Sequence, residues 1–146
     1  SSAASDVYKR QPDPSLNRWH SAAVGQALWL SVNDPTATKH ESLSFMGQAV
    51  SLTARRNGLS FNMGDGHTVH CAATTPWSPS VEPGSPSPTC GYTYQQAAPA
   101  GGYKVTAITS WDVTWSVLGH TGTVHIQKAG GQMLPVGELE SVVTRR

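Results

Sequence analysis

Residues 103–117 carry the clearest hydrophobic pattern in the chain, because large or apolar side chains occupy every second position. Strict alternation of this kind is typical of a β-strand with one buried face. Since a single strand of this length is uncommon, we expect a bend within it or a crossing from one sheet region to another. The alternating residues are Tyr103, Val105, Ala107, Thr109, Trp111, Val113, Trp115 and Val117.

Shorter runs predict further strands, and turn signals lie between them. No run has the 3.6-residue period of an amphipathic helix. Asn-Gly between two alternating runs is the strongest short hairpin signal. The sequence therefore predicts an all-β, Ig-like antiparallel β-sandwich of about seven strands. The shorter strands are expected at 27–32, 49–55, 59–63, 68–71, 92–95, 122–127 and 138–143, with turns at Asn57-Gly58, Gly101-Gly102, Gly119 and Gly130-Gly131.

Two cysteines, Cys71 and Cys90, bracket a segment that contains five of the ten prolines. Proline has no backbone donor, so this segment is a poor candidate for a central strand. We expect a disulfide that closes the loop and removes about 3 kcal/mol of unfolded-state entropy. A disulfide implies an oxidising compartment. The alternative is two buried, unbonded thiols.

The chain is divided here into three parts. Residues 1–11 resemble a translated sequencing-adaptor read-through and are expected to be a non-native tail, a genuine disordered tail being the alternative. Residues 12–23 are expected to be a linker, and residues 24–146 the folded domain. No signal peptide is visible, and we expect that truncation has removed it. The longest apolar run, 22–32, is shorter than the roughly 18 residues of a membrane span and is expected to be a core strand.

Charge adds little to this picture. Charged residues make up 13% of the chain and the formal net charge is +1, whereas a typical globular protein has about 25% charged residues. The arginines form no basic stripe that would hold phosphates, which argues against nucleic acid as a partner.

Two segments resemble the signatures of PKD (polycystic kidney disease) domains. Residues 61–66 resemble the Trp-Asp-Phe-Gly-Asp-Gly signature. Residues 92–94 and 101–107 resemble the second signature, in which His-x-Tyr precedes a Pro-Gly-x-Tyr-x-Val strand. The departures are Phe61, Asn62, Met63, Tyr92 and Gly101. The positions that carry the resemblance are Phe61, Asn62, Met63, Gly64, Asp65, Gly66, Tyr94, Tyr103 and Val105.

A similar likeness covers more of the chain. Small secreted or surface proteins of actinobacteria carry a Met-Gly-Asp-Gly-Thr-x-Val-x-Cys segment, which residues 63–71 resemble. Residues 88–94, 106–115 and 136–140 resemble three further segments of those proteins. This likeness implies no activity. The PKD resemblance implies an extracellular or cell-envelope location, with roles in adhesion, in spacing domains, or in contact with protein or carbohydrate.

The titratable residues give no clear catalytic or metal-binding pattern. Asp65 is expected to lock its turn through backbone amides rather than to bind calcium or act as an acid. His67 and His70 are three apart, so on a strand they point to opposite faces. We expect Asp65, His67 and His70 not to form a compact cleft. The sequence therefore predicts a non-enzyme without catalytic residues, metal or cofactor.

Three tryptophans are the candidate binding residues. Trp111 and Trp115 share one face of the alternating strand, and we expect at least one of them to be core. If both were exposed, they would form a platform for sugar stacking. Trp77 lies in the proline-rich loop, residues 72–89, which we expect to be the recognition surface if Trp77 is largely exposed. The expected function is a non-catalytic extracellular or cell-envelope module for protein or glycan binding or for domain spacing. The alternative is a carbohydrate-binding or accessory module of a secreted polymer hydrolase.

Overall fold

The computed structural model of this chain describes residues 21–32 and 37–138. The predicted tail at 1–11, most of the predicted linker at 12–23 and nearly all of the last predicted strand at 138–143 lie outside these residues. The described part of the chain contains nine β-strands and no helix, which confirms the all-β prediction.

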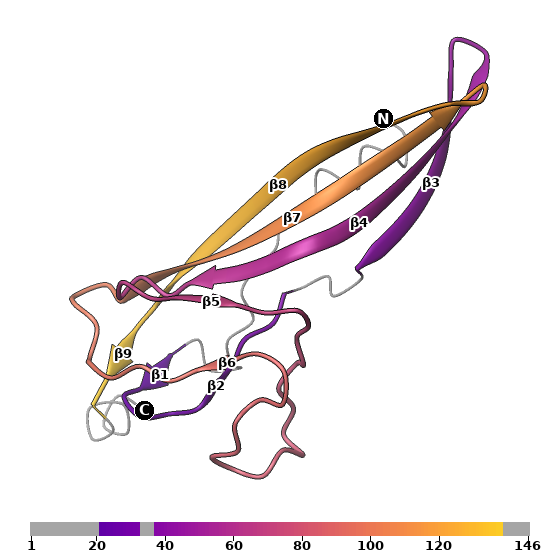
Figure 1. The fold of residues 1–146 in the computed structure, drawn as a ribbon. Coiled ribbons are helices and arrows are strands. Elements are labelled where there is room, and N and C mark those ends of the chain that lie inside the picture. Colours follow the sequence, from indigo (N-terminus) through magenta and orange to yellow (C-terminus); the bar gives the residue numbers. More distant parts are fainter. Residues whose placement is uncertain (1–20, 33–36, 139–146) are drawn as a thin grey trace.

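Three long strands form the centre of a twisted antiparallel sheet (Figure 1). They are β4 (Gln48–Asn62), β7 (Tyr103–Val117) and β8 (His120–Leu134). On the edge of β4 that faces away from β7, β3 (Thr38–Phe45) pairs with the first half of the strand and β5 (Thr68–His70) with its last residues. Two different strands therefore share one edge of β4 at its opposite ends.

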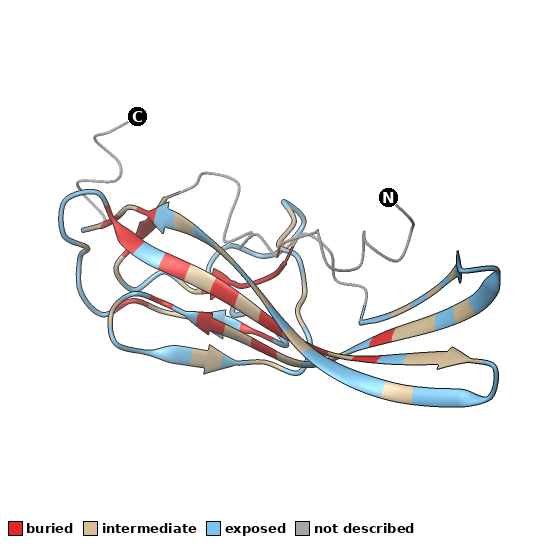
Figure 2. Cartoon of the chain, turned by 90° about the horizontal axis from the view of Figure 1, so that it is seen from above, coloured by how far each residue is buried: buried red, intermediate tan, exposed pale blue. Residues whose placement is uncertain are grey.

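Four short strands make the second layer of the sandwich. β1 (Ala22–Ala23) pairs in parallel with β9 (Val136–Gly137), and β2 (Leu28–Trp29) pairs antiparallel with β6 (Gly91–Tyr92). They cover the half of the sheet that contains β5, and Figure 2 shows the buried residues concentrated there. β1 falls at the end of the predicted linker and its Ala22 is buried, so the fold begins before residue 24.

The main core lies between these two layers. Apolar side chains from both layers exclude water there, which is the dominant favourable contribution to folding. The two aromatic residues carried by the second signature stack in this core, with the rings of Tyr94 and Tyr103 4.5 Å apart. The buried members are Ala22, Leu28, Leu30, Val32, Leu59, Phe61, Met63, Cys90, Tyr94, Tyr103, Val105, Ala107, Leu134 and Val136.

Beyond the core the sheet continues as a projection of β3, β4, β7 and β8 (Figure 1). We call this projection, residues 38–55 and 112–125, the arm. A second, small cluster of Ala54, Trp111 and Val113 lies at its base. The arm ends in two hairpin turns at the same end of the molecule. β7 thus crosses from the core into the arm as one strand, as its length suggested.

Two predicted turns are wrong. Asn57-Gly58 is not a hairpin turn: β4 runs through it with a bulge between Arg56 and Gly58. Gly130-Gly131 lies inside β8, where both residues pair with β7. In each case pairing with β7 overrides the local turn preference. At Asn57-Gly58 a bulge accommodates the extra residue without ending the strand. The strands at 38–45 and 136–137 were not predicted, and the nine described strands exceed the predicted number of about seven.

Candidate functional site

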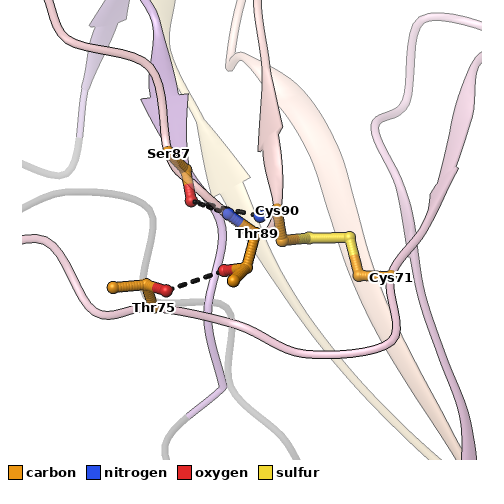
Figure 3. The surroundings of a disulfide bond; sticks show 5 residues. All are labelled: Cys71, Thr75, Ser87, Thr89 and Cys90. Carbon is orange, nitrogen blue, oxygen red and sulfur yellow. Dashed lines mark hydrogen bonds between the residues drawn. A yellow bond between two sulfur atoms is a disulfide. The ribbon is translucent and has the colours of Figure 1, made fainter.

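The proline-rich loop is closed by the predicted disulfide between Cys71 and Cys90 (Figure 3). Close to the disulfide, the Ser87 hydroxyl accepts hydrogen bonds from the backbone N–H groups of Thr89 and Cys90. The Thr75 and Thr89 hydroxyls bond each other at 2.8 Å. These contacts fix the start and end of the loop to each other.

The loop is also fastened to the second layer of the sandwich. The indole N–H of Trp29 on β2 donates a hydrogen bond to the Ser85 carbonyl at 2.8 Å. Trp77 is half-buried, so it matches neither of the two outcomes expected for it, a largely exposed anchor or a core plug. In Figure 1 part of the loop extends beyond β2 and β6, so the contact with Trp29 fastens one side of the loop to the domain.

The Gly64-Asp65-Gly66 turn is locked by its own side chains. The Asp65 carboxylate accepts a hydrogen bond from the His67 backbone N–H at 3.0 Å, and Asn62 Oδ1 accepts one from the Gly64 N–H at 3.0 Å. Gly64 has a φ of +79°, and a Cβ at this position would lie 2.6 Å from the Lys104 carbonyl oxygen. Glycine is therefore required here for both conformation and space.

Asp65 and His67 come together with Tyr92 beside a cavity, so the expectation that Asp65, His67 and His70 form no compact cleft is wrong for the first two. The Tyr92 hydroxyl donates to Asp65 Oδ2 at 2.5 Å and lies 3.0 Å from His67 Nδ1. His67 Nδ1 is also 3.4 Å from Asp65 Oδ1. These contacts border a cavity of about 570 Å³, and its lining residues are Asp65, His67, Gln95, Gln96, Ala97, Ala98, Pro99 and Tyr103. His70 does not line it.

Burial and hydrogen bonding shift the pKa values of Asp65 and Tyr92. Burial disfavours ionisation of Asp65, but the hydrogen bonds from Tyr92 and His67 outweigh it and lower the pKa of the carboxyl. Burial and the same hydrogen bond to Asp65 raise the pKa of Tyr92. Asp65 is therefore a carboxylate and Tyr92 a neutral phenol at neutral pH.

These charge states limit the chemistry of the cleft. A general acid or base works best with a pKa near the operating pH, and the pKa values of Asp65 and Tyr92 move away from it. The Tyr92 hydroxyl donates its hydrogen bond to Asp65, so the phenol oxygen is left as an acceptor for His67 Nδ1. Within residues 21–32 and 37–138 there is no group of three or more His, Cys, Asp or Glu side chains that would hold a metal ion. The lining of the cleft combines polar side chains with the apolar Ala97, Ala98 and Pro99.

Tyr92 is the member of this cluster that sequence reasoning missed. It is 27 residues from Asp65 in the sequence, and only folding brings β6 beside the turn that follows β4. The one available signal was its position in the second signature, where tyrosine replaces histidine.

The two tryptophans of β7 do not form an exposed pair. Trp111 is buried at the base of the arm, and the Lys39 ammonium lies 5.7 Å from the centre of its ring. This agrees with the expectation that at least one tryptophan is core. Trp115 is half-buried and lies beside Gly122 of β8. A sugar-stacking platform built from both rings is therefore not available.

The tips of the arm are the third candidate surface, and the sequence did not point to them. Met46-Gly47 joins β3 to β4 and Leu118-Gly119 joins β7 to β8, each as a two-residue turn. All four residues have positive φ, with 52° at Met46 and 49° at Leu118. This is the pattern of type I′ turns, in which Asn-Gly is the preferred sequence. Phe45, Met46 and Leu118 are 63%, 86% and 72% exposed.

No family model, curated protein or solved structure matches this chain. The likeness to PKD domains and to the small actinobacterial proteins therefore remains a prediction from the residues. Among the described residues no helix is long and apolar enough to cross a membrane.

Proposed function

We propose that this chain is a non-catalytic binding module of the extracellular space or cell envelope, which makes its contact through the tips of the arm. The observation that carries the proposal is the exposure of Phe45, Met46 and Leu118 at one end of the molecule. Exposed apolar patches rimmed by polar residues commonly mark interaction sites. The disulfide between Cys71 and Cys90 supports an oxidising location.

The geometry of the arm supports a role in display. β4, β7 and β8 are anchored in the main core and run without interruption into the arm. Binding residues are commonly placed on turns that a rigid scaffold positions. The proline-rich loop is fastened to Trp29 and its Trp77 is half-buried, whereas the large apolar residues of the tips are exposed.

The cleft beside Asp65 supports a second candidate, a small polar ligand such as a glycan unit. Its lining combines a fixed carboxylate with two exposed glutamine side chains, Gln95 and Gln96. Groups of this kind orient polar ligands through hydrogen bonds. The test is glycan binding by wild type and by Gln95→Ala, and an unchanged affinity would exclude the cleft.

The proposal is tested by binding of the purified protein to washed actinobacterial cell envelopes. The double variant Met46→Asn/Leu118→Asn should lower the affinity by about tenfold or more, because it removes two exposed apolar side chains. The matched control is Met133→Asn, since Met133 is 52% exposed but pairs with Lys104 at the core end of β8. Equal binding by wild type and the double variant would contradict the proposal.

The loop hypothesis is tested in the same assay with Trp77→Ala. We expect this variant to lose stability because Trp77 is half-buried, and to bind envelopes like the wild type. A loss of binding at unchanged stability would instead assign recognition to the proline-rich loop.

A further inference from the structure

We infer that the tips of the arm insert into the interfacial region of a lipid bilayer. This inference rests on the proposed function, because it names the partner of the same surface. It depends on three features of the arm: the residue types in its turns, the distribution of charge along its strands, and the relative height of its two tips.

The turns use residues that oppose the local backbone preference. Met46 and Leu118 both have left-handed φ, a conformation that asparagine and glycine adopt far more readily than large apolar residues. Each of the two turns places its large apolar residue at this strained position, fully outside the core. Strain held at two equivalent exposed positions points to selection for the side chain itself rather than for the turn.

Charge is absent from the whole end of the arm. Residues 42–54 and 113–127 contain no Asp, Glu, Lys or Arg, and His120 and His125 are their only titratable residues. The fixed charge nearest to the β3–β4 turn is that of Glu41. Glu41 pairs across the sheet with Leu52, which pairs with Trp115 and then Gly122, and we call such a line of paired residues a row. Four rows of paired residues separate Glu41 from the turn, which is about 14 Å at the usual strand rise.

This depth suits a bilayer interface. Peripheral apolar segments bury to about 5–10 Å at the boundary between headgroups and acyl chains, so insertion to this depth would leave Glu41 in water. β3 pairs with β4 and β7 with β8 up to both turns, which limits the number of unsatisfied groups carried into the interface to those on the outer edges and beyond the last β4–β7 pair. Trp115, in the same row as Glu41, would lie on the water side of the inserted zone.

The two tips reach this zone at different depths. The last pair between β4 and β7 toward the tips is Ser51 with Ser116, which places Leu118 level with Ala49. The β3–β4 turn then extends about two rows, or about 7 Å, further than the β7–β8 turn. Figure 1 shows both turns at the same end of the arm. Phe45 and Met46 would enter first and Leu118 would follow.

A bilayer fits these features better than a protein partner does. Protein interfaces commonly use complementary charges to steer and orient the partner. The end of the arm offers apolar side chains surrounded by serine, threonine and glutamine, with no fixed charge to orient a partner. Partition into lipid requires neither orientation nor charge.

The test is partition of the full chain into vesicles of phosphatidylcholine alone, and of phosphatidylcholine with phosphatidylglycerol. We expect wild type to bind both, with little dependence on salt, because the inserting surface carries no fixed charge. Met46→Asn/Leu118→Asn should lower the partition coefficient by about tenfold or more, whereas Met133→Asn should leave it unchanged. Asn-Gly is the favoured type I′ sequence, so the double variant should remain folded and the loss should come from the side chains.

The outcomes separate this inference from the proposed function. If wild type fails to bind either vesicle but binds envelopes in a manner that depends on Met46 and Leu118, the lipid inference is overturned and the partner is a protein or glycan. Vesicle binding that the double variant retains also overturns it. If wild type binds neither vesicles nor envelopes, both proposals fail. If wild type binds only the vesicles that contain phosphatidylglycerol and loses this binding at high salt, a basic surface causes the binding. That result would overturn insertion by the tips.

Discussion

The indole ring of Trp115 occupies the space that a side chain at Gly122 would fill. The two residues are cross-strand partners on β7 and β8, and a Cβ at position 122 would lie 2.4 Å from the ring. An aromatic side chain that covers a glycine on the adjacent strand compensates for the packing that the glycine lacks. Trp115 therefore stabilises the arm where the main core does not reach.

Replacement of Gly122 by alanine should displace the Trp115 ring. We expect a loss of about 1–3 kcal/mol in the free energy of unfolding, because the added methyl group overpacks the contact. Chemical denaturation measures this loss. Gly58→Ala is the control, since its Cβ would meet Ser110 at an ordinary 3.4 Å. Equal stability of the two variants would show that the ring moves aside freely.

Asparagine at the tips should stabilise the protein while it removes the apolar contact surface. Met46→Asn and Leu118→Asn each relieve a left-handed apolar residue, a conformation that costs about 1–2 kcal/mol. We expect each variant to gain about 0.5–1 kcal/mol and to unfold a few degrees higher by calorimetry. The same change at Met133, inside β8, should give no gain, since asparagine is disfavoured in strands. A lower unfolding temperature for both tip variants would contradict the strain assigned to the turns.

Loss of the disulfide should destabilise the domain without removing the arm. Cys71→Ala/Cys90→Ala opens a loop with a sequence separation of 19, and the model of chain entropy assigns about 3 kcal/mol to a closure of that size. Urea unfolding of the variant, compared with oxidised wild type, measures the difference. Full reduction of wild type should reproduce it. A difference below about 1 kcal/mol would mean that Trp29 and Ser87 hold the loop unaided.

The Asp65–Tyr92 pair should make stability fall at both ends of the pH range. The pKa of Asp65 lies below its ordinary value of 3.8 in the fold, so its contribution to stability is present above pH 3.8 and lost as the pH falls further. The pKa values of Tyr92 and Tyr94 lie above 10.0 in the fold. Their native forms hold the proton more tightly, so stability is present below pH 10.0 and lost as the pH rises.

Tyr92→Phe separates this pair from other titrating groups. It should lose about 1 kcal/mol at neutral pH, because Asp65 loses a hydrogen bond, and its acid unfolding should begin at a higher pH. The alkaline limb should remain in part, since Tyr94 keeps its buried hydroxyl and its bond to the Met63 carbonyl. Urea midpoints across the pH range measure both limbs. An acid limb identical to that of wild type would show that Asp65 does not depend on Tyr92.

The alternation at residues 103–117 predicted β7 to the residue, because its odd positions face a buried layer along most of the strand. The strand at 38–45 escaped prediction because its pattern of exposed and half-buried residues carries no strong apolar period. Asn57-Gly58 shows the limit of local signals, since the same dipeptide suits a hairpin turn and a bulge. The pairing of β4 with β7 on both sides of Asn57 makes this dipeptide a bulge. That pairing depends on a strand far away in the sequence, so the dipeptide alone does not predict it.

The candidate sites were less accessible to sequence reasoning than the fold. Spacing alone separates His67 from His70, but it gives no information on Tyr92, which reaches Asp65 from another strand. The tips were missed for a different reason. Turn rules favour asparagine and glycine at positive φ, so a rule that looks for good turns passes over Met46 and Leu118, whose exposure and strain are the informative features.

The unbroken course of β4, β7 and β8 has a mechanical consequence. A pull on both tips along the strand direction would act on β4, β7 and β8 in the same sense, so these strands would carry the load together from the arm to the core. Force applied at the tips would therefore reach the core as tension along continuous backbone. The arm would move with the core as one stiff body, without a hinge between them.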